Sequence, residues 1–178
     1  MLVEKLTENE YCIDIDSIEE CQQLAVAIAK QPLVPGCIAL VGTLGAGKTQ
    51  FTRFFAMEIG ANPEEVSSPT FVLLHQYDTT PPLCHVDAYR LGDEDEFLEI
   101  GIEEVLENDC ITIIEWADRF PDLLPRDHLM LQFSQVDSRP HQRRIHAVST
   151  GPRSLAWITS SLDRLPSRIK RDETHDMT

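Results

Sequence analysis

The sequence contains Gly42-Thr43-Leu44-Gly45-Ala46-Gly47-Lys48-Thr49, which fits the pattern GxxxxGK(S/T) at each fixed position. A polyphosphate needs several N–H donors that converge on it, and glycines let the backbone curl around it with no Cβ in the way. Lys48 has the reach to contact β- and γ-phosphate oxygens, and the Thr49 hydroxyl is a suitable ligand for Mg²⁺. The motif therefore predicts a loop of eight residues that binds the phosphates of a nucleotide.

The residues on either side of this loop have the pattern that such a loop requires. Before it, Cys37–Val41 is a short apolar run, typical of a strand buried on both faces. After it, apolar residues recur at helical spacing from about residue 47 to Ile59, and Gly60 stands where a helix ends. The positive end of the helix dipole then points at the phosphates. This context favours a working site over a chance match.

Two acidic residues follow buried strands later in the chain. Glu115 comes after Ile111-Thr-Ile-Ile114, and Asp87 comes after Leu83-Cys-His-Val86. A Mg²⁺-nucleotide site needs an acid at the end of a neighbouring strand, either to hold the metal or to orient an attacking water. A solvated strand-end acid is the alternative for each residue, but beside this loop we expect both to serve the site.

Three features near these residues admit two interpretations each. Ser67-Ser68-Pro69-Thr70 lies where switch loops with a γ-phosphate-sensing threonine occur in other P-loop proteins, but an ordinary proline turn fits equally well. Trp116 follows Glu115 directly, and we interpret it as a packing residue rather than a functional one. His85 stands two residues before Asp87, on the same strand face, and we interpret it as a satisfied structural histidine rather than a functional one. No Asn-Lys-x-Asp segment is present, so ATP is favoured over a guanine nucleotide.

Periodicity in the rest of the chain predicts an α/β fold with a mixed sheet. A capping box at Ser17-Ile-Glu-Glu20 starts a helix that runs to Lys30. The acidic stretch Asp93–Glu107 contains interleaved apolar residues and predicts one or two short amphipathic helices. The other expected strands are 11–16, 71–77, 83–87, 110–114, 128–133 and 144–148, and a closing helix is expected at 154–165. We expect one domain over residues 1–165 and a polar, disordered tail over 166–178.

Composition and charge exclude several classes of protein. The 178 residues carry 30 acidic and 15 basic side chains, a net charge of −15, which disfavours a broad nucleic-acid-binding face. Residues 119–178 hold 10 basic against 7 acidic residues, so a locally basic surface stays open. The sequence shows neither a membrane-spanning run nor a signal peptide, and we expect a cytoplasmic protein. The five cysteines lack metal-ligand spacing, and we expect them to be reduced core residues rather than zinc ligands.

Taken together, the motifs resemble those of TsaE proteins, the small P-loop ATPases of bacterial tRNA threonylcarbamoyladenosine formation. The resemblance extends from about Ser17 to Leu165. Its pieces are the loop 42–49, Ser68-Pro-Thr-Phe71, His85-Val-Asp-Ala-Tyr-Arg-Leu91 and Ile114-Glu-Trp116. It implies a P-loop NTPase fold in a single α/β domain, with a mixed, mostly parallel sheet and flanking helices.

The same resemblance implies roles for individual residues. Thr49 and Glu115 match Mg²⁺ ligands, and residues 42–49 match the nucleotide-binding loop. Asp87 matches a residue tied to ATP hydrolysis, with Lys48 as the phosphate-binding lysine beside it. The Ser-Pro-Thr segment matches a switch loop near the γ-phosphate, so Thr70 is expected to bind the nucleotide. Ser68 and Trp116 are expected to support the site.

Partners are implied only by the resemblance. They would be similar to TsaD and TsaB, with ATP hydrolysis by a weak, partner-dependent ATPase resetting their complex between modification cycles. Two alternatives stay open from the residues alone: a small-molecule kinase, which would need an acceptor pocket and a lid, and a nucleotide switch that binds partners without hydrolysis. The stretch Asp93–Glu107 is either a solvated face or a docking surface for a basic partner. Direct contact of the basic C-terminal region with tRNA also stays open.

Overall fold

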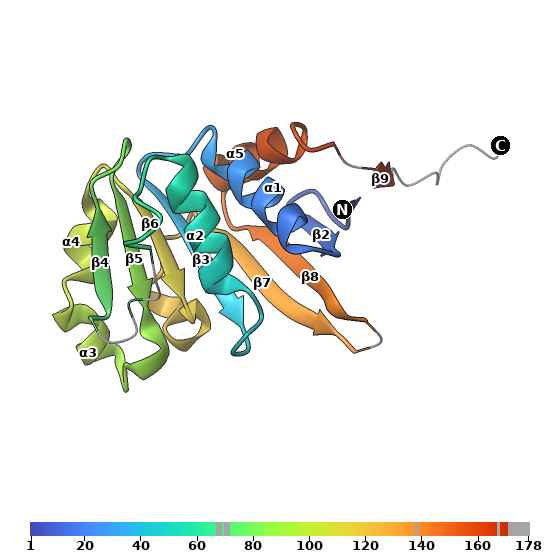
Figure 1. Ribbon diagram of the computed structural model, residues 1–178. Helices are drawn as coiled ribbons and strands as arrows, with labels where there is room; N and C mark the ends of the chain where they lie inside the picture. The colour runs from blue at the N-terminus through green and yellow to red at the C-terminus, as the bar shows by residue number, and fades with distance from the viewer. Residues whose placement is uncertain (67–68, 70–71, 138, 167, 171–178) are drawn as a thin grey trace.

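Strand β3 (Gly36–Gly42) and helix α2 (Lys48–Glu58) are joined by the glycine-rich loop, as predicted. Figure 1 shows a computed structural model, which describes residues 1–66, 69, 72–137, 139–166 and 168–170. The other strands are β1 (Leu2–Lys5), β2 (Glu10–Ile15), β4 (Leu74–Tyr77), β5 (Leu83–Asp87), β6 (Ile111–Glu115), β7 (Leu129–Val136), β8 (Arg139–Ser149) and β9 (Arg168–Lys170). The other helices are α1 (Ile18–Ala29), α3 (Glu94–Glu99), α4 (Ile102–Glu107) and α5 (Pro152–Leu162), with 3₁₀ turns η1 (Ala88–Arg90), η2 (Ala117–Arg119) and η3 (Pro121–Leu123).

Within the described residues, nine strands form one sheet in the order β4-β5-β6-β3-β7-β8-β2-β1-β9. Its centre is parallel, because β6 pairs in parallel with β5 and β3, and β3 pairs in parallel with β7. β4 and the strands β8, β2 and β1 pair antiparallel with their neighbours, and β9 pairs in parallel with β1. The predicted mixed sheet with a mostly parallel core is confirmed. Its parallel strands bring their carboxyl ends to one edge, where open α/β sheets bind ligands.

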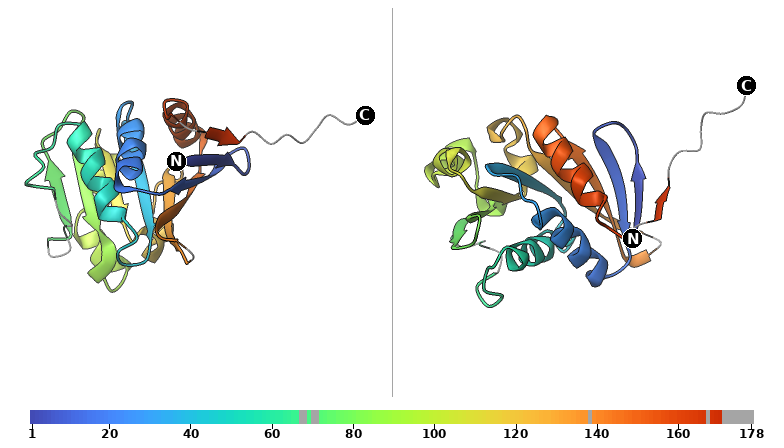
Figure 2. Two further views of the ribbon diagram at one scale, coloured as in Figure 1. Left: turned by 45° about the vertical axis from the view of Figure 1, so that its right-hand side comes forward. Right: turned by 90° about the horizontal axis from the view of Figure 1, so that it is seen from above.

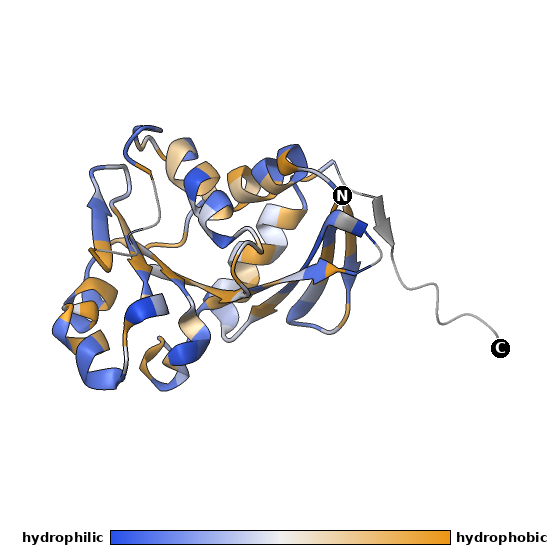
Figure 3. Ribbon diagram, turned by 60° about the horizontal axis from the view of Figure 1, so that its bottom comes forward, coloured by the Kyte–Doolittle hydropathy of each residue, from blue (hydrophilic) through white to orange (hydrophobic). Residues whose placement is uncertain are grey.

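Helices cover both faces of this sheet (Figures 1 and 2). Helices α1, α2 and α5 lie on one face, over a core that includes Leu24, Phe51 and Ile158. Helices α3 and α4 lie on the other face, over a second core that includes Phe97 and Ile102. Figure 3 shows the result as apolar residues along the central strands and polar residues on the outer faces of the helices.

Strand β3 shows why a continuous apolar run predicts a central strand. Ile38 and Leu40 belong to the core under α1, α2 and α5, whereas Cys37 and Ala39 belong to the core under α3 and α4. Successive side chains of a strand point to opposite faces, so both faces of β3 need apolar residues. The strand that carries the loop is therefore fixed in position by two cores.

Helix α1 starts as its capping box predicts. The Ser17 hydroxyl accepts a hydrogen bond from the Glu20 backbone N–H at 3.3 Å, and the Glu20 carboxylate accepts one from the Asp16 N–H at 2.7 Å. The helix ends at Ala29, with Lys30 as its C-cap. Both ends agree with the prediction to within a residue.

Other elements differ from the prediction in extent. β8 begins at Arg139 rather than 144, because its pairing with β7 continues along the hairpin. β4 begins at Leu74 rather than 71, after Leu73 adopts a left-handed φ of 67°. β1 was not predicted, because four residues are too few for a clear alternation. Of the expected tail, residues 168–170 form β9 against β1, and 167 and 171–178 lie outside the described residues.

Two expectations concern the molecule as a whole. Within the described residues, no helix combines the length and the apolar composition needed to cross a bilayer. All five cysteines are free thiols; Cys21, Cys37, Cys84 and Cys110 are buried, and Cys12 is half-buried.

Candidate nucleotide-binding site

The glycine-rich loop leaves β3 at Gly42, where the backbone has a φ of 139°. A Cβ at this position would lie 2.4 Å from the carbonyl oxygen of Phe133 on β7. Only glycine fits both this conformation and this close approach. The first fixed glycine of the motif therefore serves the packing of β3 against β7, and the loop then turns back into the N-terminus of α2.

Lys48 lies folded across the loop. Its ammonium donates hydrogen bonds to the carbonyl oxygens of Gly42 at 2.6 Å and Thr43 at 3.1 Å. The same nitrogen lies 3.8 Å from the ring centroid of Trp116. Burial lowers the pKa of Lys48, and the charges of Glu115, Asp87 and Asp118 act in the opposite direction. The buried cation is thus stabilised by carbonyl oxygens, an aromatic face and nearby carboxylates.

The two strand-end acids lie at the same level of the sheet. In the register of the central strands, Asp87 on β5 is opposite Glu115 on β6, and Glu115 is opposite Leu40 on β3. Both acids are buried, with 2% of each residue exposed. This common level follows from the parallel pairing and brings both carboxylates to the edge where the loop begins.

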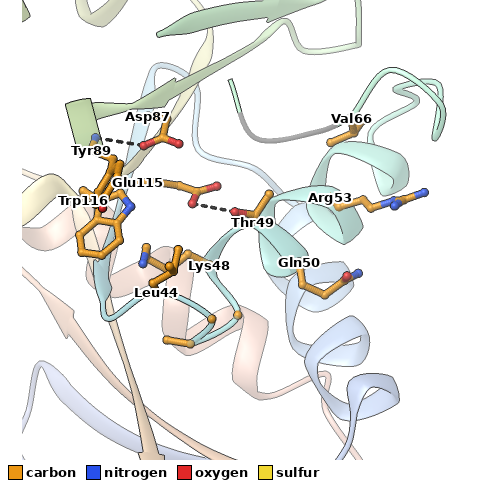
Figure 4. Close-up of a pocket in the computed structure, with 13 residues that line it drawn as sticks. Leu44, Lys48, Thr49, Gln50, Arg53, Val66, Asp87, Tyr89, Glu115 and Trp116 are labelled. Carbon is orange, nitrogen blue, oxygen red and sulfur yellow. Dashed lines mark hydrogen bonds between the residues drawn. The ribbon is translucent and has the colours of Figure 1, made fainter. Parts of the chain in front are cut away.

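Each acid has a fixed orientation (Figure 4). The Thr49 hydroxyl donates a hydrogen bond of 2.8 Å to Oε2 of Glu115. His85 Nε2 lies 2.9 Å from Oε1 of the same carboxylate. Oδ1 of Asp87 accepts a hydrogen bond of 3.0 Å from the Tyr89 backbone N–H, which caps the turn η1. Both carboxylates are held in place by the surrounding protein.

A cavity of about 640 Å³ lies between the loop and these acids. This volume is in the range of ligand-binding pockets. It is lined by Leu44, Gly45, Ala46, Gly47, Lys48, Thr49, Gln50, Arg53, Val66, Asp87, Tyr89, Glu115 and Trp116. Of the residues predicted from the sequence, loop residues 44–49, Asp87, Glu115 and Trp116 therefore line one cavity.

The donor set fits Mg²⁺ bound together with a polyphosphate. Thr49 and Glu115 offer hydroxyl and carboxylate oxygens in direct contact with each other. Among the described residues, no cluster of three or more His, Cys, Asp or Glu side chains is arranged to hold a metal. Mg²⁺ usually takes one or two carboxylates and completes its shell with substrate phosphates and water, so a single carboxylate beside a hydroxyl is sufficient.

A second, smaller cavity of about 160 Å³ adjoins the loop through Gly45, Ala46, Gly47 and Gln50. Its other walls come from the end of β2, the start of α1, β7 and β8. They are Ile15, Ser17, Ile18, Cys21, Phe133, His141 and Arg143. The sequence gives no local signal for this cavity, because only the order β7-β8-β2 in the sheet brings these residues to the loop.

Comparison with known proteins identifies the family. The family model of the threonylcarbamoyl adenosine biosynthesis protein TsaE matches residues 15–145. The chain belongs to the TsaE family. Its relatives include the tRNA threonylcarbamoyladenosine biosynthesis proteins TsaE of Bacillus subtilis, 35% identical over 74% of this chain and 78% of that protein, and of Streptomyces coelicolor, 32% identical over 81% and 98%. TsaE of Rickettsia felis is 39% identical over 90% of this chain and 94% of the relative.

Solved structures agree on the fold. The crystal structure of YdiB from Bacillus subtilis matches 92% of this chain and 97% of its own chain with a TM-score of 0.72 and 24% identity. The P-loop fold that the TsaE resemblance implies is therefore confirmed. Membership in the family makes the chain a protein of tRNA threonylcarbamoyladenosine biosynthesis.

The remaining predicted residues have different outcomes. Ser68 and Thr70 lie outside the described residues, so the switch-loop interpretation stays a prediction. Trp116 packs on Tyr89, with ring centroids 4.9 Å apart, and also covers the Lys48 ammonium, which the packing interpretation did not foresee. The interpretation of His85 as a satisfied structural residue holds for one ring nitrogen only: Nε2 contacts Glu115, but Nδ1 has no hydrogen-bond partner among the described residues.

Sequence reasoning missed four residues of the larger cavity: Gln50, which directly follows Thr49, and Arg53, Val66 and Tyr89. Arg53 lies one helical turn after Thr49, a spacing that places both on one side of α2 and was available as a signal. Tyr89 lies two residues after Asp87, and its partial exposure at the cavity follows from the turn η1. Val66 comes from the loop after α2, where the sequence has no periodicity to place it.

Proposed function

We propose that the chain binds ATP with Mg²⁺ in the 640 Å³ cavity and hydrolyses it, as an accessory protein of tRNA threonylcarbamoyladenosine modification. The observation that carries this proposal is the convergence of Lys48, Thr49, Asp87 and Glu115 at one edge of the sheet. These are a phosphate-binding cation, a hydroxyl and two carboxylates, around a loop of backbone N–H groups. Phosphoryl transfer needs mainly this positioning and charge stabilisation.

Binding of ATP draws on groups that are already close to the cavity. The loop supplies backbone N–H groups, and α2 adds the positive end of its dipole at Lys48. On binding, the Lys48 ammonium exchanges the carbonyls of Gly42 and Thr43 for phosphate oxygens. Thr49 and Glu115 would hold Mg²⁺, which neutralises charge on the β- and γ-phosphates when bound.

Hydrolysis depends on Asp87 in this proposal. Its carboxylate lines the cavity and is oriented by the Tyr89 N–H. It would accept a hydrogen bond from the attacking water, whose oxygen bonds to the γ-phosphorus while the bond to the β–γ bridging oxygen breaks. The products are ADP and phosphate. The proton of the water leaves by way of Asp87 or a phosphate oxygen.

A low rate for the isolated chain follows from the arginine that lines the cavity. Arg53 donates to the Pro63 carbonyl at 3.3 Å, and Figure 4 shows it pointing away from Glu115 and Lys48. An arginine that reaches the γ-phosphate typically raises the rate of P-loop hydrolases by several orders of magnitude. Partners similar to TsaD and TsaB would complete the site, and work on tRNA would place the protein in the cytoplasm.

The smaller cavity suits the nucleoside end of ATP. The γ-phosphate would lie on the side of the loop that faces Asp87 and Glu115, and the ribose would then leave the loop on its other side. There the 160 Å³ cavity offers the ring of Phe133, the apolar Ile18 and the cation of Arg143. Contacts of this kind would bind the base through its faces. They give no information on the protein's partners.

Phosphate release tests the proposed function. The chain is incubated with Mg²⁺-ATP alone and with a purified complex of its TsaD-like and TsaB-like partners, beside Lys48→Ala as a control. We expect slow release from the chain alone, faster release with partners, and none above background for Lys48→Ala. Binding to partners only with ATP, without any release, would support a switch instead. Release stimulated by a small-molecule acceptor rather than by partners would support a kinase.

A further inference from the structure

His85 is buried in the middle of β5 and points at a proposed metal ligand. None of its surface is exposed, and its Nε2 lies 2.9 Å from Oε1 of Glu115, which is 2% exposed. A carboxylate only accepts hydrogen bonds, so Nε2 carries the proton in this contact. The contact joins β5 to the neighbouring strand β6 within the sheet core.

The other ring nitrogen of His85 has an unfavourable environment. Nδ1 is buried and has no hydrogen-bond partner in the part of the chain that the structure describes. An apolar side chain at this position would avoid that desolvation cost, as Leu83 and Val86 do on the same strand. A residue that only fills the core does not need a polar ring here. The contact with Glu115 is what the histidine adds.

Glu115 is held from two sides by different elements. Among the described residues, its hydrogen-bond partners are Thr49 on α2, at Oε2, and His85 on β5, at Oε1. The Thr49 hydroxyl is itself a proposed Mg²⁺ ligand, so metal binding would replace its hydrogen bond to Glu115. His85 makes no contact that metal binding would need to replace. It can therefore fix the carboxylate before and after binding.

We propose that His85 is the positioning residue for Glu115, and that its Nε2–H orients the carboxylate for Mg²⁺ bound with ATP. The inference rests on the proposed function, because it concerns the metal of that site. A ligand that is already oriented loses less freedom on binding, which is the usual role of groups that hydrogen-bond a metal ligand from behind. Loss of such a group typically lowers metal affinity about 10–100-fold.

Three substitutions separate orientation from packing. In His85→Gln the amide nitrogen can replace Nε2, whereas His85→Asn is too short to bring a donor to Glu115. His85→Leu fills the core without a donor. The matched control is His146→Leu, because His146 on β8 also contacts a carboxylate, with Nε2 3.1 Å from Glu10 Oε2, at the half-exposed surface away from the cavity.

The experiment measures ATP affinity by calorimetry in excess Mg²⁺ and in EDTA, for wild type and each variant, with thermal unfolding as a check of folding. We expect the Mg²⁺-dependent gain in affinity to fall about tenfold or more in His85→Asn and His85→Leu. His85→Gln and His146→Leu should keep most of the gain, and ATP affinity in EDTA should be similar in all five proteins. If His85→Leu does not fold, the Gln and Asn pair decides the question.

Two results would overturn the inference, and they are distinguishable from a failure of the proposed function. An equal Mg²⁺-dependent gain in His85→Gln, His85→Asn and wild type would show that His85 has no part in orienting the metal ligand. An equal loss in His85→Gln and His85→Asn would show that the Nε2–H donor is not what supports metal binding. If wild type shows no ATP binding at all, the proposed function fails first, and the inference falls with it.

Discussion

The Thr49 hydroxyl on the first turn of α2 donates a 2.8 Å hydrogen bond to the Glu115 carboxylate at the end of β6, 66 residues later in the chain. The helix after the loop and the neighbouring parallel strand are thereby connected at the mouth of the cavity. Oε2 of Glu115 accepts this hydrogen bond, and Oε1 of the same carboxylate lies 2.9 Å from Nε2 of His85. The hydrogen bond brings a hydroxyl oxygen and a carboxylate oxygen close together, as the proposed Mg²⁺ site needs.

Removal of the Thr49 hydroxyl should separate metal-dependent from metal-independent binding of ATP. In Thr49→Val the side chain keeps its volume but loses the ligand oxygen. We expect the gain in ATP affinity from Mg²⁺ to fall at least tenfold, while affinity in EDTA changes little. Thr49→Ser keeps the oxygen and serves as the control. Calorimetric titration measures both, and equal gains in Val and Ser variants would remove Thr49 from the metal site.

Lys48→Ala should abolish detectable ATP binding, because it removes the cation that faces the phosphates. The same change takes away the hydrogen bonds to the Gly42 and Thr43 carbonyls and the contact with Trp116. Lys30→Ala, at the exposed C-cap of α1, is a control of equal charge change. Equilibrium binding of a fluorescent ATP analogue measures the effect. Undiminished affinity in Lys48→Ala would mean that nucleotide does not sit on the loop.

Asp87→Ala should bind ATP but not turn it over. The carboxylate lines the cavity at the level of Glu115, yet its role in the proposal is toward water rather than toward the nucleotide. Loss of a residue that positions or deprotonates the nucleophile costs roughly 10²–10⁴-fold in rate. Single-turnover phosphate release, with partners present, measures this. A rate equal to that of wild type would exclude Asp87 from catalysis.

Much of this site was predictable from local sequence. The strand–loop–helix unit was predicted because its signals lie within about 25 consecutive residues: the apolar run of β3, the glycines and the apolar positions of α2. Asp87 and Glu115 were predictable because parallel strands bring their ends to one edge whatever the details of packing. These parts depend on periodicity and topology alone.

The parts that escaped prediction depend on contacts between distant segments. His85 touches Glu115 because β5 and β6 are neighbours, which no pattern within either strand records. The smaller cavity joins Ile18 to Arg143 through the order of the sheet. The strands β1 and β9 are too short for periodicity to reveal. β9 also lies within the C-terminal segment 166–178, whose composition is polar.

Asp127 should stabilise helix α5 through its N-terminus. Its carboxylate accepts hydrogen bonds from the backbone N–H groups of Arg153 and Ser154, each at 2.9 Å. Partial burial acts to raise the pKa of Asp127, but the hydrogen bonds from Ser154 and Arg153 outweigh it, and the pKa is lowered. We expect Asp127→Ala to lower the free energy of unfolding by about 1 kcal/mol at pH 7.

The contribution of Asp127 should depend on pH in one direction. Because its pKa is lower in the folded chain, the stabilisation is present above about pH 4 and is lost as the pH falls through the folded pKa. Urea unfolding of wild type and Asp127→Ala at pH 7 and pH 3 measures the difference, with Asp122→Ala as the exposed control. A difference that grows toward pH 3 would contradict this account of the helix cap.

Cysteine reactivity should follow burial. Burial raises the pKa of the Cys37 and Cys84 thiols to about 12 and that of Cys21 to about 11, and Cys12 is only half-buried. We expect iodoacetamide at pH 8 to label Cys12 first and the other three only on unfolding. Since these thiols resist ionisation when folded, stability should fall as the pH rises above about 9. Mass spectrometry of labelled peptides measures the order, and early labelling of Cys37 would contradict it.

A crystal structure with Mg²⁺ and a non-hydrolysable ATP analogue tests the central claim most directly. We predict triphosphate within the loop 42–49, the Lys48 ammonium moved from the carbonyls of Gly42 and Thr43 to phosphate oxygens, and a metal ion bound by Thr49 and Glu115. A nucleotide bound elsewhere on the molecule, with Lys48 still on those carbonyls, would contradict the account.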